Sequence, residues 1–138
     1  MTEPLLNVLI VDDEPTYRLV LTQTLKGCGH TTEACETGDD AISLLQKNKY
    51  DVVLLDYKMP GTSGINVLQW MYGMKMDVPV IIITGYGSEG SEQAARQLGA
   101  IEYIEKSWNI ESMIDRISTA VRKLSGVEKG EEKPGKEK

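Results

Sequence analysis

Cysteine is scarce in this chain, which contains only Cys28 and Cys35 among its 138 residues. The two lack the Cys-x-x-Cys spacing of redox and zinc motifs, and they form no framework of the kind that staples small secreted domains. In a reducing compartment, two such thiols are expected to be small packing residues. Neither a disulfide nor a metal site built on cysteine is therefore predicted.

Apolar runs long enough to cross a bilayer, about 20 residues, are absent as well. Hydrophobic residues make up 41% of the chain and charged residues 26%, which is typical of one globular domain. The chain begins Met-Thr-Glu-Pro, without the basic start and cleavage site of a secretory signal. We therefore expect a cytoplasmic protein that does not bind membranes.

A concentrated basic surface is the third missing feature. The 21 acidic residues exceed the 15 Lys and Arg residues, for a net charge of −6, whereas binding of nucleic-acid phosphates needs clustered positive charge. No direct contact with nucleic acid is expected. In segment 126–138, four acidic and four basic side chains cancel, and too few apolar residues are present to build a core. This predicts a folded domain over residues 1–125 and a flexible charged tail over residues 126–138.

Apolar runs alternate with helical patterns along residues 5–124. The runs at 5–11, 52–56 and 78–84 are nearly continuous, as in strands buried on both faces of a parallel sheet, and weaker strands are expected at 31–34 and 101–105. Helical spacing follows at 15–28, 41–45, 65–72, 88–98 and 110–124, with Tyr72 expected on the buried stripe of the third helix and Asn109 as the cap of the last. Five such units predict an α/β fold, a doubly wound, five-stranded parallel sheet flanked by five helices.

Charged and hydroxyl side chains stand directly after the expected strands, at Asp12, Asp13, Asp56, Thr84 and Lys106. Parallel sheets bind ligands at this edge, so these side chains are expected to converge. Three carboxylates that lie close together repel one another unless a cation neutralises them, and Mg²⁺ prefers such oxygen ligands. A carboxylate can also attack phosphorus if Lys106 and Mg²⁺ neutralise the transferred oxygens and Thr84 donates a hydrogen bond. Each residue alone has an ordinary explanation as a loop, surface or strand residue, but their joint order indicates a phosphoryl-accepting site.

Four segments resemble those of response regulator receiver domains, namely VLIVDDEP, VVLLDYKMPGTSG, IIITGYGS and GAIEYIEKS. The similarity covers residues 5–124. It implies a flavodoxin-like strand order of 2-1-3-4-5. It also implies a signalling switch that a histidine kinase, a phosphotransfer protein or a small phosphodonor phosphorylates in a Mg²⁺-dependent step. Such a protein catalyses its own phosphorylation and dephosphorylation and turns over no separate substrate.

The same resemblance implies a role for each position of the site. The Mg²⁺ ligands would be Asp12, Asp13, Asp56 and the backbone carbonyl of Lys58. Asp56 would also be the phosphoryl acceptor, and Lys106 would be the lysine that binds the phosphoryl group. Thr84 would be the switch hydroxyl, and Tyr103 would be the aromatic residue that rotates inward on activation. Phosphorylation is expected to change a surface formed by the fourth helix, the fifth strand and the fifth helix. That surface would bind a downstream protein or a second copy of the chain.

Ser107 and several aromatic residues near the site yield further expectations. Ser107 stands where the family usually has a proline after the lysine. A cis bond before a residue other than proline costs about 2.5–4 kcal/mol, so we predict a trans Lys106–Ser107 bond and a shifted loop.

Tyr86 is expected to lie over the phosphoryl group and slow attack by water. Trp70 and Trp108 are expected to pack half-buried rather than to be exposed partner contacts.

Two other functions share parts of this pattern. A flavodoxin-like flavin binder has the same layers, but it needs a loop rich in Ser, Thr and Gly after the first strand, where this chain has DDEPT. A phosphohydrolase with an aspartyl nucleophile would use Asp12 with Glu14 as its general acid, but no cap domain is evident to enclose a small substrate. The cognate kinase and the output pathway stay open. Because no effector domain follows residue 125, we favour a stand-alone receiver over a fragment of a longer regulator.

Overall fold

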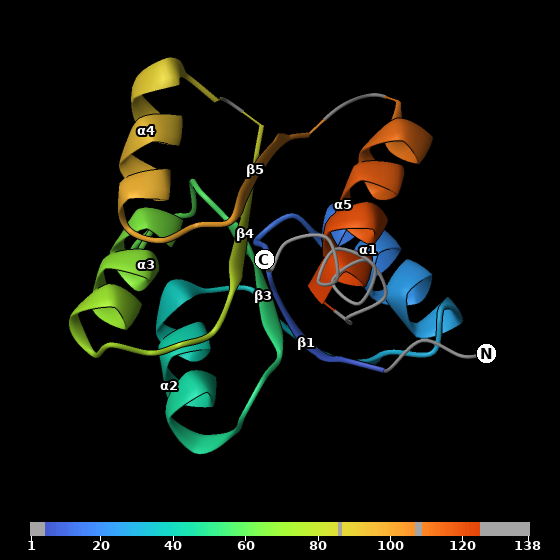
Figure 1. The fold of residues 1–138 in the computed structure, drawn as a ribbon, viewed down its shortest axis with the longest axis horizontal. Coiled ribbons are helices and arrows are strands. Elements are labelled where there is room, and N and C mark those ends of the chain that lie inside the picture. Colours follow the sequence, from blue (N-terminus) through green and yellow to red (C-terminus); the bar gives the residue numbers. More distant parts are fainter. Residues whose placement is uncertain (1–4, 86, 107–108, 125–138) are drawn as a thin grey trace, which may run out of the picture.

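Five strands and five helices alternate along the described residues of the computed structural model, which are 5–85, 87–106 and 109–124 (Figure 1). The strands are β1 (Asn7–Val11), β2 (Thr31–Cys35), β3 (Val52–Asp56), β4 (Val80–Thr84) and β5 (Glu102–Glu105). The helices are α1 (Pro15–Gly27), α2 (Gly38–Lys47), α3 (Gly64–Gly73), α4 (Glu89–Gln97) and α5 (Ile110–Leu124). All ten predicted elements are present, and β4 begins later than predicted, after Pro79, which has no N–H to donate to a strand partner.

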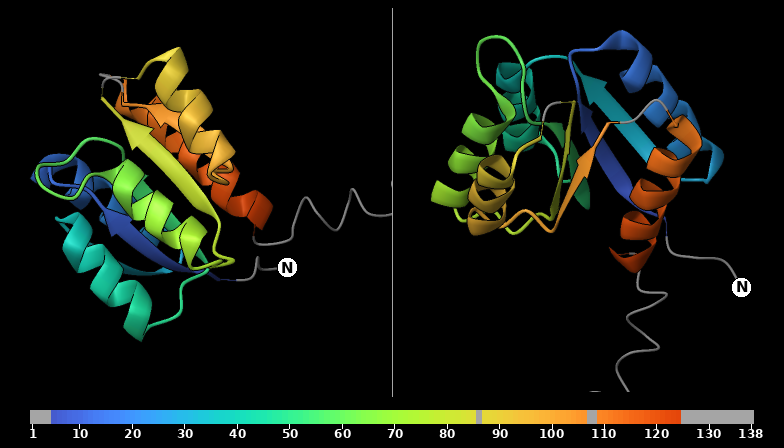
Figure 2. Two further views of the ribbon diagram at one scale, coloured as in Figure 1. Left: turned by 90° about the vertical axis from the view of Figure 1, so that its left-hand side faces the viewer. Right: turned by 90° about the horizontal axis from the view of Figure 1, so that it is seen from above.

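The sheet has the order β2-β1-β3-β4-β5, and every neighbouring pair of strands is parallel. Helices α1 and α5 cover one face, and α2, α3 and α4 cover the other, as the view from above in Figure 2 shows. This arrangement confirms the predicted doubly wound α/β fold and its strand order. The carboxyl ends of all five strands therefore lie along one edge of the sheet.

Alternating side chains of the central strands supply two separate cores. Val8, Ile10, Leu54, Ile83 and Ile104 pack with α1 and α5, whereas Leu9, Val11, Val53, Leu55 and Ile82 pack with α2, α3 and α4. β2, the weakest of the predicted strands, has no buried residue and lies at the edge of the sheet. Continuous apolar runs thus mark the strands with helices on both sides, as expected for a covered parallel sheet.

Local signals set the ends of the helices. Pro15 occupies the first position of α1, where its missing N–H breaks no helical hydrogen bond. The side chain of Ser88 accepts a hydrogen bond from the backbone N–H of Ser91 at 3.1 Å and so caps α4. At α5, Oδ1 of Asn109 accepts from the backbone N–H of Ser112 at 3.0 Å, which confirms the predicted cap.

Two predictions about packing are wrong. Tyr72 was expected on the buried stripe of α3, but it is 60% exposed, because Val67, Leu68 and Met71 already fill the sheet-facing side of this helix. Cys28 was expected to be a packing residue, but it is exposed, since it follows the last turn of α1. Trp70 is half-buried and packs against the core, as expected.

Some expectations fall on residues outside the described ranges. These are the tail at 126–138, the Lys106–Ser107 bond, Tyr86 and Trp108. The division of the chain at residue 125 also stays a prediction. Within the described ranges, none of the helices combines the length and the apolar character that a membrane crossing requires.

Candidate functional site

The register of the sheet determines which side chains meet at its carboxyl edge. Val11 pairs with Leu55, so the next residues along, Asp12 and Asp56, end neighbouring strands. The backbone N–H of Asp12 donates to Cys35 at 3.1 Å and extends the ladder between β1 and β2 by one residue. Both aspartates therefore occupy positions fixed by backbone pairing rather than by a flexible loop.

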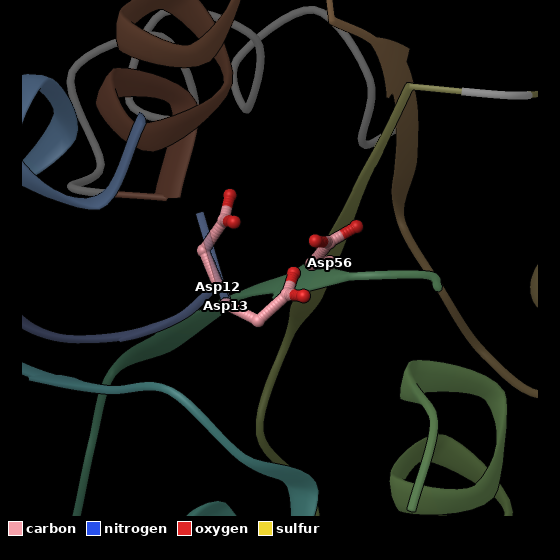
Figure 3. A group of neighbouring side chains, drawn as sticks. All are labelled: Asp12, Asp13 and Asp56. Atoms are coloured by element: carbon pink, nitrogen blue, oxygen red, sulfur yellow. The ribbon is translucent and has the colours of Figure 1, made fainter. Parts of the chain in front are cut away.

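Three carboxyl groups converge at this edge. Asp12 and Asp13 follow β1, Asp56 ends β3, and one carboxylate oxygen of each lies within 4.8 Å of the others (Figure 3). Asp12 and Asp56 are almost completely buried, at 1% and 3% exposure. Oδ2 of Asp12 lies in an ion pair with Lys106, whose hydrogen bond goes to Oδ1 instead, and it accepts no hydrogen bond from any described residue. Three carboxylate groups that lie close together, one of them with a buried oxygen that accepts no hydrogen bond, form a set of ligands that suits Mg²⁺.

Lys106 reaches into this cluster from the end of β5. Its Nζ lies 3.1 Å from Oδ2 of Asp12 and 3.3 Å from Oδ2 of Asp56, and it also forms an ion pair with Glu14. The backbone N–H of Lys106 donates to the carbonyl of Thr84 at 2.7 Å, which continues the β4–β5 ladder and fixes the base of the side chain. The side chain is only 4% exposed. The ammonium group is therefore a buried, positioned cation.

The electrostatics of the cluster show a shortage of positive charge. Burial, and then the charge of Asp12, raise the pKa of Asp56 from 3.8 to about 7, although Lys106 opposes this shift. Burial also raises the pKa of Asp12. For Lys106, burial would lower the pKa, but the hydrogen bond to Glu14 and the charges of Asp12 and Asp56 outweigh it and raise the pKa. One lysine does not neutralise these carboxylates, and a bound divalent cation would.

Thr84 and Tyr103 lie on the other face of the sheet. Thr84 ends β4 and is fully buried, and Tyr103 pairs with Ile82, two residues before Thr84. The Tyr103 ring is already inside the core at 6% exposure. Its hydroxyl oxygen lies 2.5 Å from Oγ of Ser91 at the start of α4. Its ring meets that of Tyr57 edge to face, with centroids 6.5 Å apart.

The loop after β3 folds back over the acceptor. A Cβ at Gly64 would collide with the backbone of Asp56, and the N–H of Gly64 donates to the carbonyl of Tyr57 at 2.9 Å. Only glycine therefore allows α3 to begin this close to Asp56. Lys58 lies in this loop, two residues after Asp56, with an exposed side chain.

Three residues beside the cluster had no part in the predicted phosphoryl-accepting site. Glu14 contacts Lys106, and the Tyr17 ring centroid lies 4.6 Å from its Nζ. Arg18 donates from Nη1 to the backbone carbonyl of Asp12 at 2.7 Å. All three belong to the first turn of α1 or to its cap, so Pro15, which follows Glu14 and marks the start of this helix, was the signal that could have placed them at this edge.

A family model described as the response regulator receiver domain matches residues 8–118. The sporulation initiation phosphotransferase F of Bacillus subtilis (strain 168) is 34% identical over 110 residues, which cover 80% of this chain and 89% of that protein. The two-component response regulator ARR2 of Arabidopsis thaliana is 35% identical over 120 residues, or 86% of this chain. The chain spans only 18% of the length of ARR2.

A solved structure with the same fold is described as response regulator protein TrrA from Thermotoga maritima in complex with Mg(2+)-BeF. It is 33% identical, has a TM-score of 0.75, and the match covers 90% of this chain and 99% of that one. The match of the family model to most of the chain decides against the flavin-binding and phosphohydrolase alternatives. The chain belongs to the response regulator receiver domain family and is a phosphoryl-accepting switch of two-component signalling.

Proposed function

We propose that Asp56 accepts the phosphoryl group in a Mg²⁺-dependent step, from a histidine kinase, a phosphotransfer protein or a small phosphodonor. One observation carries the assignment. Asp56 is a buried carboxylate that ends a central strand, within 4.8 Å of two further carboxylates and 3.3 Å from the Lys106 ammonium nitrogen. A nucleophile, ligands for a cation and a fixed positive charge therefore meet at one point, as phosphoryl transfer requires.

Asp12, Asp13 and Asp56, with the backbone carbonyl of Lys58, would hold the ion. When bound, Mg²⁺ neutralises the carboxylates and the charge on the transferred oxygens. The relative TrrA, described in complex with Mg(2+)-BeF, supports this choice of metal. The shortage of positive charge around Asp56 supports it independently, because its pKa of about 7 leaves the carboxyl partly protonated at neutral pH without a further cation.

The chain's own residues would then catalyse their own modification. An oxygen of Asp56 attacks phosphorus, the new Asp–O–P bond forms, and the bond from phosphorus to the donor's leaving group breaks with its electron pair. Lys106 neutralises an oxygen of the transferred group, and the Thr84 hydroxyl donates a hydrogen bond to it. Attack of water on phosphorus returns Asp56 to the free carboxylate and releases phosphate.

The phosphorylation signal would reach partners through a change in structure on the opposite face of the sheet. Movement of Thr84 toward the phosphoryl group would change the packing around Tyr103, and with it the surface of α4, β5 and α5. That surface contains a hollow of about 460 Å³ lined by charged side chains that include Glu92, Arg96 and Arg116. We assign to it a downstream protein or a second copy of the chain, and we place this signalling in the cytoplasm.

The experiment that tests the assignment of Asp56 is incubation of the pure protein with acetyl phosphate, with and without Mg²⁺, followed by intact mass measurement. We expect one added phosphoryl group only when Mg²⁺ is present. Asp56→Asn should remove the label, whereas the matched control Asp115→Asn, at an exposed position of α5, should retain it. Labelling without Mg²⁺, or labelling that persists in Asp56→Asn, would refute the mechanism.

A further inference from the structure

The Lys106 ammonium group has a carboxylate partner for every proton. An ammonium carries three N–H donors, and Nζ contacts Asp12, Asp56 and Glu14. The aromatic ring of Tyr17 also contacts Nζ, with its centroid 4.6 Å away. A phosphoryl oxygen therefore binds this ammonium only if one of the three carboxylates gives up its place.

The three carboxylates are not equally free to leave. Asp12 and Asp56 are buried at the ends of strands and belong to the metal cluster. The Glu14 side chain is 54% exposed and caps no backbone N–H of α1. Its carboxylate can move into water at little cost, because more than half of its side chain is already exposed to solvent.

The backbone of Glu14 stays fixed when its side chain moves. Its N–H donates to Oδ1 of Asp12 at 2.8 Å, and its carbonyl accepts from the N–H of Arg18 at 3.0 Å. The side chain therefore has a defined starting position on Lys106 and an open path to solvent. The carboxylate can thus leave Lys106 and return while the backbone of Glu14 stays in place.

We propose that Glu14 regulates the phosphoryl site by competing with the phosphoryl group for Lys106. Its carboxylate occupies the ammonium group while Asp56 is free, and it leaves for solvent when Asp56 carries the phosphoryl group. The inference rests on the proposed function of Asp56 and Lys106. It assigns to Glu14 a positioning role that lowers the affinity of the site for tetrahedral phosphoryl groups.

The test is the affinity of the full chain for beryllofluoride with saturating Mg²⁺, a probe that mimics the phosphoryl group on aspartate. Glu14→Gln keeps the size of the side chain and removes its charge. We expect it to bind beryllofluoride about 1.5-fold to fivefold more tightly than the wild type, in line with release of one ion pair whose glutamate is largely exposed. Glu14→Ala should do the same, which shows that the new amide group is not the cause.

Glu36→Gln is the matched control. Glu36 is an exposed neighbour that pairs with Arg18 at 3.8 Å and makes no ion pair with Lys106 among the described contacts. Loss of its charge measures how much the removal of any nearby negative charge strengthens the binding of the beryllofluoride anion. The gain of Glu14→Gln over this control should persist in 1 M salt, where the screening length is about 3 Å. The ¹⁵N NMR signal of the Lys106 ammonium should also shift in Glu14→Gln without beryllofluoride and stay unchanged in Glu36→Gln.

The outcomes separate the two proposals. If the wild type binds no beryllofluoride in the presence of Mg²⁺, the proposed function itself fails, and the role of Glu14 fails with it. If the wild type binds the probe but Glu14→Gln matches Glu36→Gln, only the competition is overturned. Weaker binding by Glu14→Gln would mean that the glutamate supports the site, which also overturns it.

Discussion

The two faces of the central sheet carry different parts of the switch. Side chains alternate along each strand, so Asp56 shares its face with Leu54 and Ile83 under α1 and α5, whereas Thr84 shares its face with Ile82 under α2, α3 and α4. Lys106 lies on the same face as Asp56, and Tyr103 lies on the same face as Thr84. The buried carboxylate of Asp56 and the Lys106 ammonium group therefore lie over one core, and Thr84 and the Tyr103 ring lie over the other.

In the proposed function, a change at Asp56 on one face would alter the packing of Thr84 and Tyr103 on the other. The faces meet where β3 and β4 end, because Tyr57 follows Asp56 directly and its N–H donates to Ile83 at 3.0 Å. Tyr57 in turn packs edge to face on Tyr103. A rigid, hydrogen-bonded strand end thus joins the two cores, and variants on either face test how independent they are.

The largest expected effect comes from removing the Lys106 ammonium group, which lies on the face of the sheet covered by α1 and α5. Lys106→Ala leaves Asp12 and Asp56 buried without their ion-pair partner, and breaking such a pair costs about 3–5 kcal/mol of stability. We expect this loss in urea unfolding at pH 8 without Mg²⁺, and partial recovery when Mg²⁺ is added. Lys49→Ala, an exposed lysine, should change the free energy of unfolding by less than about 0.5 kcal/mol. Equal stability of the two variants would mean that Lys106 does not compensate the cluster.

The next effect is a dependence of stability on pH that arises from the same face. The folded state holds the proton of Asp56 more tightly than the unfolded state, since the pKa rises from 3.8 to about 7. The resulting stability is fully present below about pH 4 and is lost as the pH rises to about 7. Without Mg²⁺, the wild type should therefore lose roughly 2 kcal/mol relative to Asp56→Asn between pH 5 and pH 8.

Urea unfolding of both proteins in a chelator at the two pH values checks this difference. Added Mg²⁺ should raise the stability of the wild type more at pH 8 than at pH 5, because the proposed site would bind the ion through ionised carboxylates. A wild type that gains stability over Asp56→Asn on going to pH 8 would contradict the raised pKa.

Sequence patterns were sufficient for the sheet and for the positions after its strands. The buried strands have unbroken apolar runs, and the backbone register places whatever follows them at one edge, so Asp12 and Asp56 could be expected side by side. The helix surface was less certain. Adjacent residues of α3 differ by about 100° around the axis, and the pattern assigned Tyr72 inward although Met71 fills that position.

Side-chain partners across the chain were beyond the reach of pattern reasoning. Glu14 and Lys106 are 92 residues apart in sequence, and nothing local to either residue marks the other as its partner. The hydrogen bond of Tyr103 to Ser91 depends in the same way on how α4 packs against β5. A Cβ at Gly87 would press on the Tyr103 hydroxyl, so this glycine leaves room for the buried ring. These contacts are set by packing, so only the folded structure reveals them.

The smallest expected effect concerns Ser91 and Tyr103, on the face of the sheet covered by α2, α3 and α4. It tests whether this face acts independently of the carboxylate cluster. Ser91→Ala removes the partner of the Tyr103 hydroxyl together with the hydrogen bonds of Ser91 Oγ to the backbone of Ser88 in the α4 cap, and should lower the free energy of unfolding by about 0.5–1.5 kcal/mol. Tyr103→Phe removes the other partner, and a double-mutant cycle should show that the two losses are not additive. Both variants should still gain the phosphoryl mass from acetyl phosphate at the rate of the wild type, because neither residue contacts the carboxylate cluster in the described structure. With beryllofluoride, however, the change in sedimentation or partner binding expected of the wild type should be reduced in each variant. A slowed mass gain, or an undiminished response to beryllofluoride in both variants, would show that the faces are not divided in this way.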